Sequence, residues 1–288
     1  MTFRNFRLLA RLFNRLIALS GVMAFTGCTI PGPTAGEDTM DQHAPRQELR
    51  LSAGYTLSFA EAGSRDGQPV IFVHGTPGDA GAWADYLMNV PKGYRYITMD
   101  RPGFGRSGPA DAITSLTAQA NAVAELIRRL GPKPAALVGH SLGGPIIAQT
   151  AVDHPELVAA LVIVAGSLDP AQESVPFIQY VGNTWPLSAI LPRALRNANR
   201  EVILLEPQLK ALAARLSTLK LPVTIVHGTK DDLVPFANVA FMKTRMTNVT
   251  GMDVTVLEGQ NHFLPWNSKK QVDAAIMKAL AMRKTPSQ

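Results

Sequence analysis

Short apolar runs alternate with longer helical patterns from Glu48 onward, and this alternation constrains the fold more than any other feature of the chain. Several of the apolar runs are nearly continuous in Val, Ile and Leu, as in parallel strands that are covered on both faces. The alternation predicts an α/β fold built on a doubly wound, mostly parallel sheet. The predicted strands are 49–53, 55–63, 69–75, 94–100, 135–141, 157–166, 222–228 and 253–259, and the predicted helices are 114–131, 142–154, 236–246 and 267–283.

Residues 167 to about 219 interrupt this alternation, because they separate two predicted strands and contain mostly helical patterns divided by prolines. An insertion of this length between strands is usually functional. We expect a small helical cap over the carboxyl edge of the sheet. Residues 48–288 then form one domain, which is large enough to bury a core without disulfides or metals.

The first 27 residues have the layout of a secretory signal peptide rather than of a folded element. Arg4, Arg7, Arg11 and Arg15 come first with no acidic residue among them, and an apolar run from Leu16 to Thr26 follows. That run is shorter than the roughly 20 residues that span a bilayer as a helix. Residues 28–47 are rich in Pro, Gly and polar side chains, which predicts a flexible tether that includes His43.

The single cysteine of the chain, Cys28, ends the sequence Phe-Thr-Gly-Cys. This ending resembles the lipobox of bacterial lipoproteins, although Leu is usual where Phe25 stands. The resemblance implies that Cys28 carries a lipid anchor and that the protein lies in the cell envelope, at the outer membrane facing the periplasm in a Gram-negative cell. A mitochondrial transit peptide and an uncleaved interfacial helix are the alternatives for this segment.

Charge and ligand patterns exclude several classes of function. Four arginines of the leader account for most of the formal charge of +6, which leaves the rest of the chain close to neutral. No block of like charges follows, so nucleic acid is not an expected partner. One cysteine cannot form an intrachain disulfide, and no cluster of metal ligands is present in the sequence. We expect neither a metal nor a cofactor.

The pentapeptide Gly139-His-Ser-Leu-Gly143 lies between a predicted strand and a predicted helix. This is the context of a nucleophile elbow, in which a sharp turn lifts the serine hydroxyl clear of the sheet and places it at a helix N-terminus. Ser141 is therefore the candidate nucleophile. A serine hydroxyl needs a base within hydrogen-bond reach.

His262 is the candidate base, because it follows the last predicted strand on a loop that can return over the elbow. The other histidines lie in the tether, beside the serine, at a helix end or before a glycine at a strand end. An orienting acid should follow a strand and precede this histidine. Asp231 and Asp232 both meet that condition, Asp169 is a rival, and aspartates are also common in plain turns.

Five segments in order carry a family resemblance: HGTPG (74–78), DRPGFGRSG (100–108), GHSLGG (139–144), HGTKDDLVP (227–235) and GQNHF (259–263). Over residues 48–283 the chain resembles the α/β-hydrolase superfamily. In similar proteins the acid is the third residue after the glycine of the fourth segment, which selects Asp231. The resemblance also implies that the backbone N–H groups of Thr76 and Leu142 form an oxyanion hole.

Departures from related families narrow the expected chemistry. Haloalkane dehalogenases and epoxide hydrolases carry an aspartate where this chain has Ser141, and prolyl iminopeptidases differ around the serine. The resemblance implies a membrane-tethered serine hydrolase that cleaves a carboxylic ester or related acyl bond of a small molecule. Aromatic residues of the expected cap, Phe177, Tyr180 and Trp185, favour an apolar acyl or alcohol group. A carbon–carbon bond hydrolase or perhydrolase and a non-catalytic binding lipoprotein are the alternatives.

Overall fold

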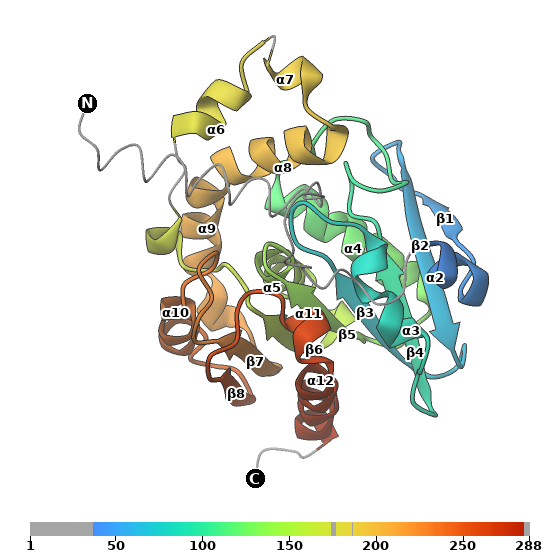
Figure 1. The fold of residues 1–288 in the computed structure, drawn as a ribbon. Coiled ribbons are helices and arrows are strands. Elements are labelled where there is room, and N and C mark those ends of the chain that lie inside the picture. Colours follow the sequence, from blue (N-terminus) through green and yellow to red (C-terminus); the bar gives the residue numbers. More distant parts are fainter. Residues whose placement is uncertain (1–36, 174–176, 186, 285–288) are drawn as a thin grey trace.

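The fold is seen in a computed structural model that describes residues 37–173, 177–185 and 187–284 (Figure 1). The expected signal peptide, Cys28 and the first part of the expected tether lie outside these residues. An eight-stranded sheet runs in the order β1-β2-β4-β3-β5-β6-β7-β8. Its strands are β1 Gln47–Arg50, β2 Thr56–Gly63, β3 Gln68–Val73, β4 Tyr94–Met99, β5 Ala135–His140, β6 Val158–Val164, β7 Pro222–Gly228 and β8 Gly251–Leu257.

The strand pairing confirms the prediction of a mostly parallel sheet. Strands β1, β2 and β4 pair antiparallel at one edge, whereas every pairing from β4 to β8 is parallel. The three central strands β3, β5 and β6 are almost entirely buried, which explains their continuous apolar sequence. All eight strands lie within a few residues of their predicted positions.

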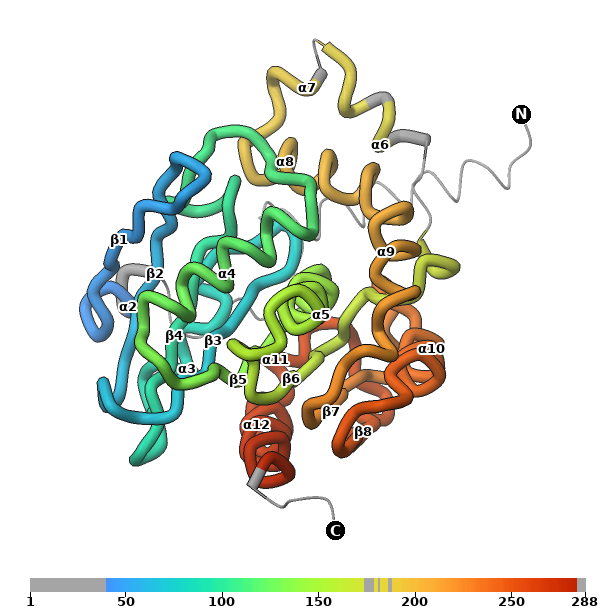
Figure 2. Tube along the Cα trace, turned by 180° about the vertical axis from the view of Figure 1, so that it is seen from behind, coloured from blue at the N-terminus to red at the C-terminus, as the bar shows by residue number. Residues whose placement is uncertain are grey.

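Helices cover both faces of the sheet (Figures 1 and 2). Helices α4 (Leu116–Leu130), α5 (Gly143–Asp153) and α10 (Ala237–Arg245) pack on one face, and α3 (Ala84–Leu87) and α12 (Lys269–Lys284) pack on the other. Side chains alternate along each strand. On β3, Ile71 therefore belongs to the first apolar cluster, and Phe72 belongs to the second, where it contacts Trp83. The two clusters confirm the doubly wound arrangement.

The tether expected over residues 28–47 is wrong for its last part. Residues Glu37–His43 form helix α2, and Gln47 already begins β1. Met40 and Ala44 are buried in the second apolar cluster, and Arg46 forms ion pairs with Asp41 and Asp100, each at 3.0 Å. One apolar side chain in a polar stretch gives no helical period, so the sequence does not indicate this helix, which is held by its contacts with the folded domain.

The insertion between β6 and β7 contains helices α6 (Phe177–Gly182), α7 (Leu187–Ile190), α8 (Arg193–Ile203) and α9 (Leu205–Ala213). They form the cap, and Figure 1 shows α6, α7 and α8 at one end of the sheet. Helix α8 is fixed to the loop after β4: Arg193 donates to the carbonyls of Gly105 and Ser107, at 2.8 and 2.6 Å, and Asn197 donates to Gly103 at 2.8 Å. The cap therefore has a fixed contact with the carboxyl edge of the sheet.

Candidate active site

Ser141 lies at a strained turn between β5 and α5. Its φ is +55°, in the left-handed region that non-glycine residues avoid. The neighbouring glycines allow the turn, because a Cβ on Gly139 would lie 2.4 Å from the carbonyl oxygen of Gly143, and a Cβ on Gly143 would lie 2.3 Å from that of Val73. No side chain fits at either position. The local geometry is the one that the pentapeptide predicts.

Asp231 and His262 are hydrogen-bonded, with 2.8 Å between His262 Nδ1 and Asp231 Oδ2. The other carboxylate oxygen of Asp231 accepts from the backbone N–H groups of Leu233 and Val234, at 3.0 and 2.7 Å. Burial tends to raise the pKa of Asp231, but the hydrogen bond and charge of His262 outweigh it, so the pKa lies below its ordinary value. The carboxylate is therefore ionised at neutral pH and oriented from both sides.

The rival acids do not contact His262. Asp232 is exposed. The carboxylate of Asp169 accepts a hydrogen bond from the backbone N–H of Ala171 at 3.0 Å, where it begins a short 3₁₀ turn. Of the three aspartates that the sequence offers, the structure brings only Asp231 to the histidine.

Ser141, His262 and Thr76 line one cavity of about 290 Å³. Phe263 and Trp266 form part of its wall. No hydrogen bond joins the Ser141 hydroxyl to His262 among the described residues, and such catalytic hydrogen bonds are often long until a substrate is bound. The predicted nucleophile, base and acid thus converge from three separate loops of the sheet.

The two predicted oxyanion donors belong to segments that adjoin Ser141. The loop that carries Thr76 packs against the serine, since a Cβ on Gly75 would lie 2.8 Å from the Cβ of Ser141. Leu142 is the residue before α5, at the helix N-terminus. Among the described residues, no backbone carbonyl accepts a hydrogen bond from the Thr76 or Leu142 N–H group. Both groups are available to a developing negative charge.

His140 and His227 also belong to the site, although sequence reasoning assigned no role to either. His140 lines the cavity, its Nε2 lies 2.9 Å from the carbonyl oxygen of His262, and the two rings are 4.7 Å apart. Burial and then His262 lower the pKa of His140 to about 3, so its neutral ring donates that hydrogen bond. His227 Nε2 lies 3.0 Å from the Val234 carbonyl, beside Asp231. Histidine spacing alone gives no signal for these contacts.

Buried neutral histidines make the fold sensitive to acid. Burial lowers the pKa values of His74, His140 and His227, whereas an unfolded histidine titrates near 6.5. Below pH 6.5 the unfolded chain therefore binds protons that the folded chain does not, and the free energy of unfolding falls as the pH falls. His140 alone should cost about 2 kcal/mol at pH 5 relative to pH 7.5. Urea unfolding at several pH values measures this loss. The variant His140→Gln should show a smaller change of the free energy of unfolding with pH. A free energy of unfolding independent of pH between 7.5 and 5 would contradict the expectation.

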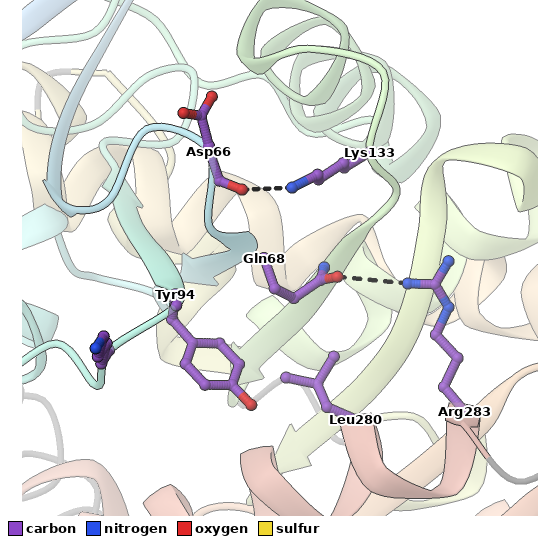
Figure 3. A pocket seen from close by; sticks show the side chains of 8 residues that line it. Asp66, Gln68, Tyr94, Lys133, Leu280 and Arg283 are labelled. Carbon is purple, nitrogen blue, oxygen red and sulfur yellow. Dashed lines mark hydrogen bonds between the residues drawn. The ribbon is translucent and has the colours of Figure 1, made fainter.

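A second cavity, of about 480 Å³, lies where β3 and β4 begin (Figure 3). Lys133 donates to the backbone carbonyl of Asp66, and Arg283 donates to the side chain of Gln68 at 3.4 Å. Figure 3 shows Tyr94 beside these groups. The cavity is larger than the one at Ser141, but neither a serine nor a histidine lines it. We therefore assign the candidate active site to the smaller cavity.

The described part of the chain offers neither a metal site nor a membrane-spanning helix. No group of three or more His, Cys, Asp or Glu side chains there is placed to hold a metal ion. None of the helices there has both the length and the apolar character needed to cross a bilayer.

Comparisons with known proteins agree with the fold. The profile of the alpha/beta hydrolase fold family matches residues 68–214, slightly more than half of the chain. A 2-hydroxy-6-oxononadienedioate/2-hydroxy-6-oxononatrienedioate hydrolase of a Pseudomonas species is 25% identical over 265 residues, covering 77% of this chain and 90% of that protein. The dihydrolipoyllysine-residue acetyltransferase component of the acetoin cleaving system of Cupriavidus necator is 35% identical over 135 residues, but this match spans only 35% of that protein.

Solved structures share the same architecture. The crystal structure of a membrane phospholipase A superimposes with a TM-score of 0.65 at 19% identity, covering 97% of this chain and 99% of that one. Identity this low establishes the fold alone. The profile match covers more than half of the chain, and the shared fold and the strained serine between β5 and α5 agree with it. The chain therefore belongs to the alpha/beta hydrolase fold family.

Proposed function

We propose that this protein is a serine hydrolase that cleaves the carboxylic ester bond of a small molecule through an acyl-enzyme. The observation that carries the proposal is the 2.8 Å hydrogen bond between Asp231 and His262, beside a cavity that His262 shares with Ser141. A carboxylate on Nδ1 holds the ring in the tautomer whose Nε2 can accept a proton.

The reaction has two halves, acylation of the serine and hydrolysis of the acyl-enzyme. Ser141 Oγ bonds to the acyl carbon while His262 Nε2 takes the hydroxyl proton, and the carbonyl electrons move to an oxyanion held by the N–H groups of Thr76 and Leu142. The oxyanion then collapses, the bond to the leaving alcohol breaks, and the alcohol takes the proton from His262. Water repeats the same steps on the acyl-enzyme and releases the acid.

Carbon–carbon bond hydrolysis is the second candidate, because the Pseudomonas relative that matches 77% of this chain is named for a dienedioate substrate. A dioate carries two carboxylates, which proteins normally bind with Arg or Lys. No Arg or Lys is among the described residues that line the cavity at Ser141, and Asp79 adds a carboxylate to it. The cavity therefore favours a neutral ester over a doubly charged dienedioate.

The test is hydrolysis of p-nitrophenyl esters of graded acyl length beside a 2-hydroxy-6-oxo-dienoate. The cavity lies near the lower end of the usual range for small-molecule sites, so we expect short acyl chains to react faster than long ones. Fluorophosphonate should label Ser141. Preference for the dienoate would move the assignment to the second candidate, and no turnover together with no labelling would overturn both and favour a binding lipoprotein.

We also propose that the protein is attached to the cell envelope through a lipid on Cys28, a residue outside the described part of the chain. Two or more acyl chains give stable membrane attachment, whereas one gives only marginal binding. Labelled palmitate should enter the wild-type protein and not Cys28→Ala. Equal labelling of the two proteins would exclude this attachment.

A further inference from the structure

Helix α8 of the cap places a buried carboxylate against the loop after β4 and helix α4. Glu201 is 3% exposed, and its oxygens lie 2.7 and 3.0 Å from the guanidinium nitrogens of Arg101, which is fully buried. The side-chain amide of Gln119 also donates to Glu201, at 3.2 Å. A buried ion pair with hydrogen bonds at this geometry resists separation, because either partner alone would leave an uncompensated charge.

The same ion pair holds the loop that carries the oxyanion donor. The Thr76 hydroxyl donates to Glu201 Oε2 at 2.6 Å, and Arg101 donates to the carbonyl of Gly75 at 3.0 Å. The ion pair thus binds two consecutive residues of the loop, Thr76 through its side chain and Gly75 through its backbone carbonyl. The peptide N–H of Thr76 lies between these two attachments.

We propose that Glu201 is a positioning residue, through which the cap sets the orientation of the Thr76 N–H in the oxyanion hole. This inference rests on the proposed ester hydrolysis. Glu201 touches no reacting atom, and it acts through the Thr76 hydroxyl. The oxyanion donor is then competent only while α8 is seated on Arg101, so the cap contributes to catalysis through this contact.

Thr76→Val tests the contact without disturbing the ion pair. Valine keeps the backbone N–H and the shape of threonine but cannot donate to Glu201. Displacement of the oxyanion donor weakens stabilisation of the transition state more than it weakens substrate binding. We therefore expect kcat to fall about tenfold or more while KM changes by less than about threefold. Affinity for a trifluoromethyl ketone, which forms a tetrahedral oxyanion on serine, should fall with kcat. Thr76→Ser, which restores the hydroxyl, should recover most of the loss.

A double-mutant cycle separates positioning from structural support. Glu201→Gln should lower kcat in the wild-type background but have little further effect in the Thr76→Val background, since the contact is already lost. The matched control is Glu206→Gln, which changes a half-buried glutamate of α9 whose ion-pair partner among the described residues is Lys210. Thermal unfolding of each variant reports whether the fold is retained.

The outcomes distinguish this inference from the proposed function. An active wild-type protein whose kcat is unchanged by Thr76→Val overturns the inference alone. Equal losses from Glu201→Gln in both backgrounds also overturn it, because Glu201 then acts independently of Thr76. Wild-type protein that neither hydrolyses esters nor reacts with fluorophosphonate overturns the proposed function, and the inference with it.

Discussion

Ser141→Ala is expected to lower kcat for ester hydrolysis by about 10⁶-fold, the scale seen when a serine nucleophile is removed from an intact triad. The reason is covalent: without the hydroxyl no acyl-enzyme forms, and the oxyanion hole and binding alone retain only a small residual rate. Steady-state rates on the best p-nitrophenyl ester, together with loss of fluorophosphonate labelling, measure the effect.

The fold should survive this change. Alanine keeps the Cβ that the backbone already tolerates at a φ of +55°, so thermal unfolding should shift little. Ser217→Ala, the same chemical change at an exposed position of the 3₁₀ turn Leu216–Thr218, is the matched control and should retain full activity. Substantial residual turnover that rises in proportion to the amount of the Ser141→Ala protein would show that another group is the nucleophile.

Asp231→Asn should give the second largest loss, about 10⁴-fold in kcat, with the protein still folded. An asparagine amide can donate to His262 Nδ1, which leaves the proton on Nε2 and prevents that nitrogen from accepting the serine proton. The carboxylate charge that stabilises the imidazolium is lost as well. The rate should be compared at several pH values, because a tautomer effect lowers kcat throughout the range.

Asp232→Asn is a closely matched control, because it makes the same chemical change at the next residue, whose side chain is exposed. It should keep wild-type kcat. A greater loss from Asp232→Asn than from Asp231→Asn would reverse the assignment of the acid. A greater loss from Asp169→Asn would move the acid to the loop after β6.

Local sequence signals were sufficient for the framework of the fold. Continuous apolar runs and helical periods located the strands and the main helices to within a few residues, because burial on one or both faces dictates those patterns residue by residue. The strained turn at Ser141 was also predictable, since its glycines are required by backbone clashes within the turn itself and with the adjacent strand. Helix α2 was missed because its stability comes from contacts distant in the sequence.

Pairing between polar side chains was not predictable in the same way. The residues alone left Asp231, Asp232 and Asp169 as possible acids, and only the family resemblance chose among them before the structure showed the hydrogen bond to His262. The contact of His140 with the His262 carbonyl had no sequence signal, because it joins residues 122 positions apart.

The sequence by itself therefore determined the order of strands and helices along the chain, and it predicted Ser141 as the nucleophile and His262 as the base, since each depends on local burial or on a motif. Only the tertiary structure decided which carboxylate faces His262, that residues 37–47 are ordered, and that Glu201 of the cap meets Arg101 and Thr76. These contacts have no periodicity, because they arise where distant segments exclude water together and each buried polar group must find a partner.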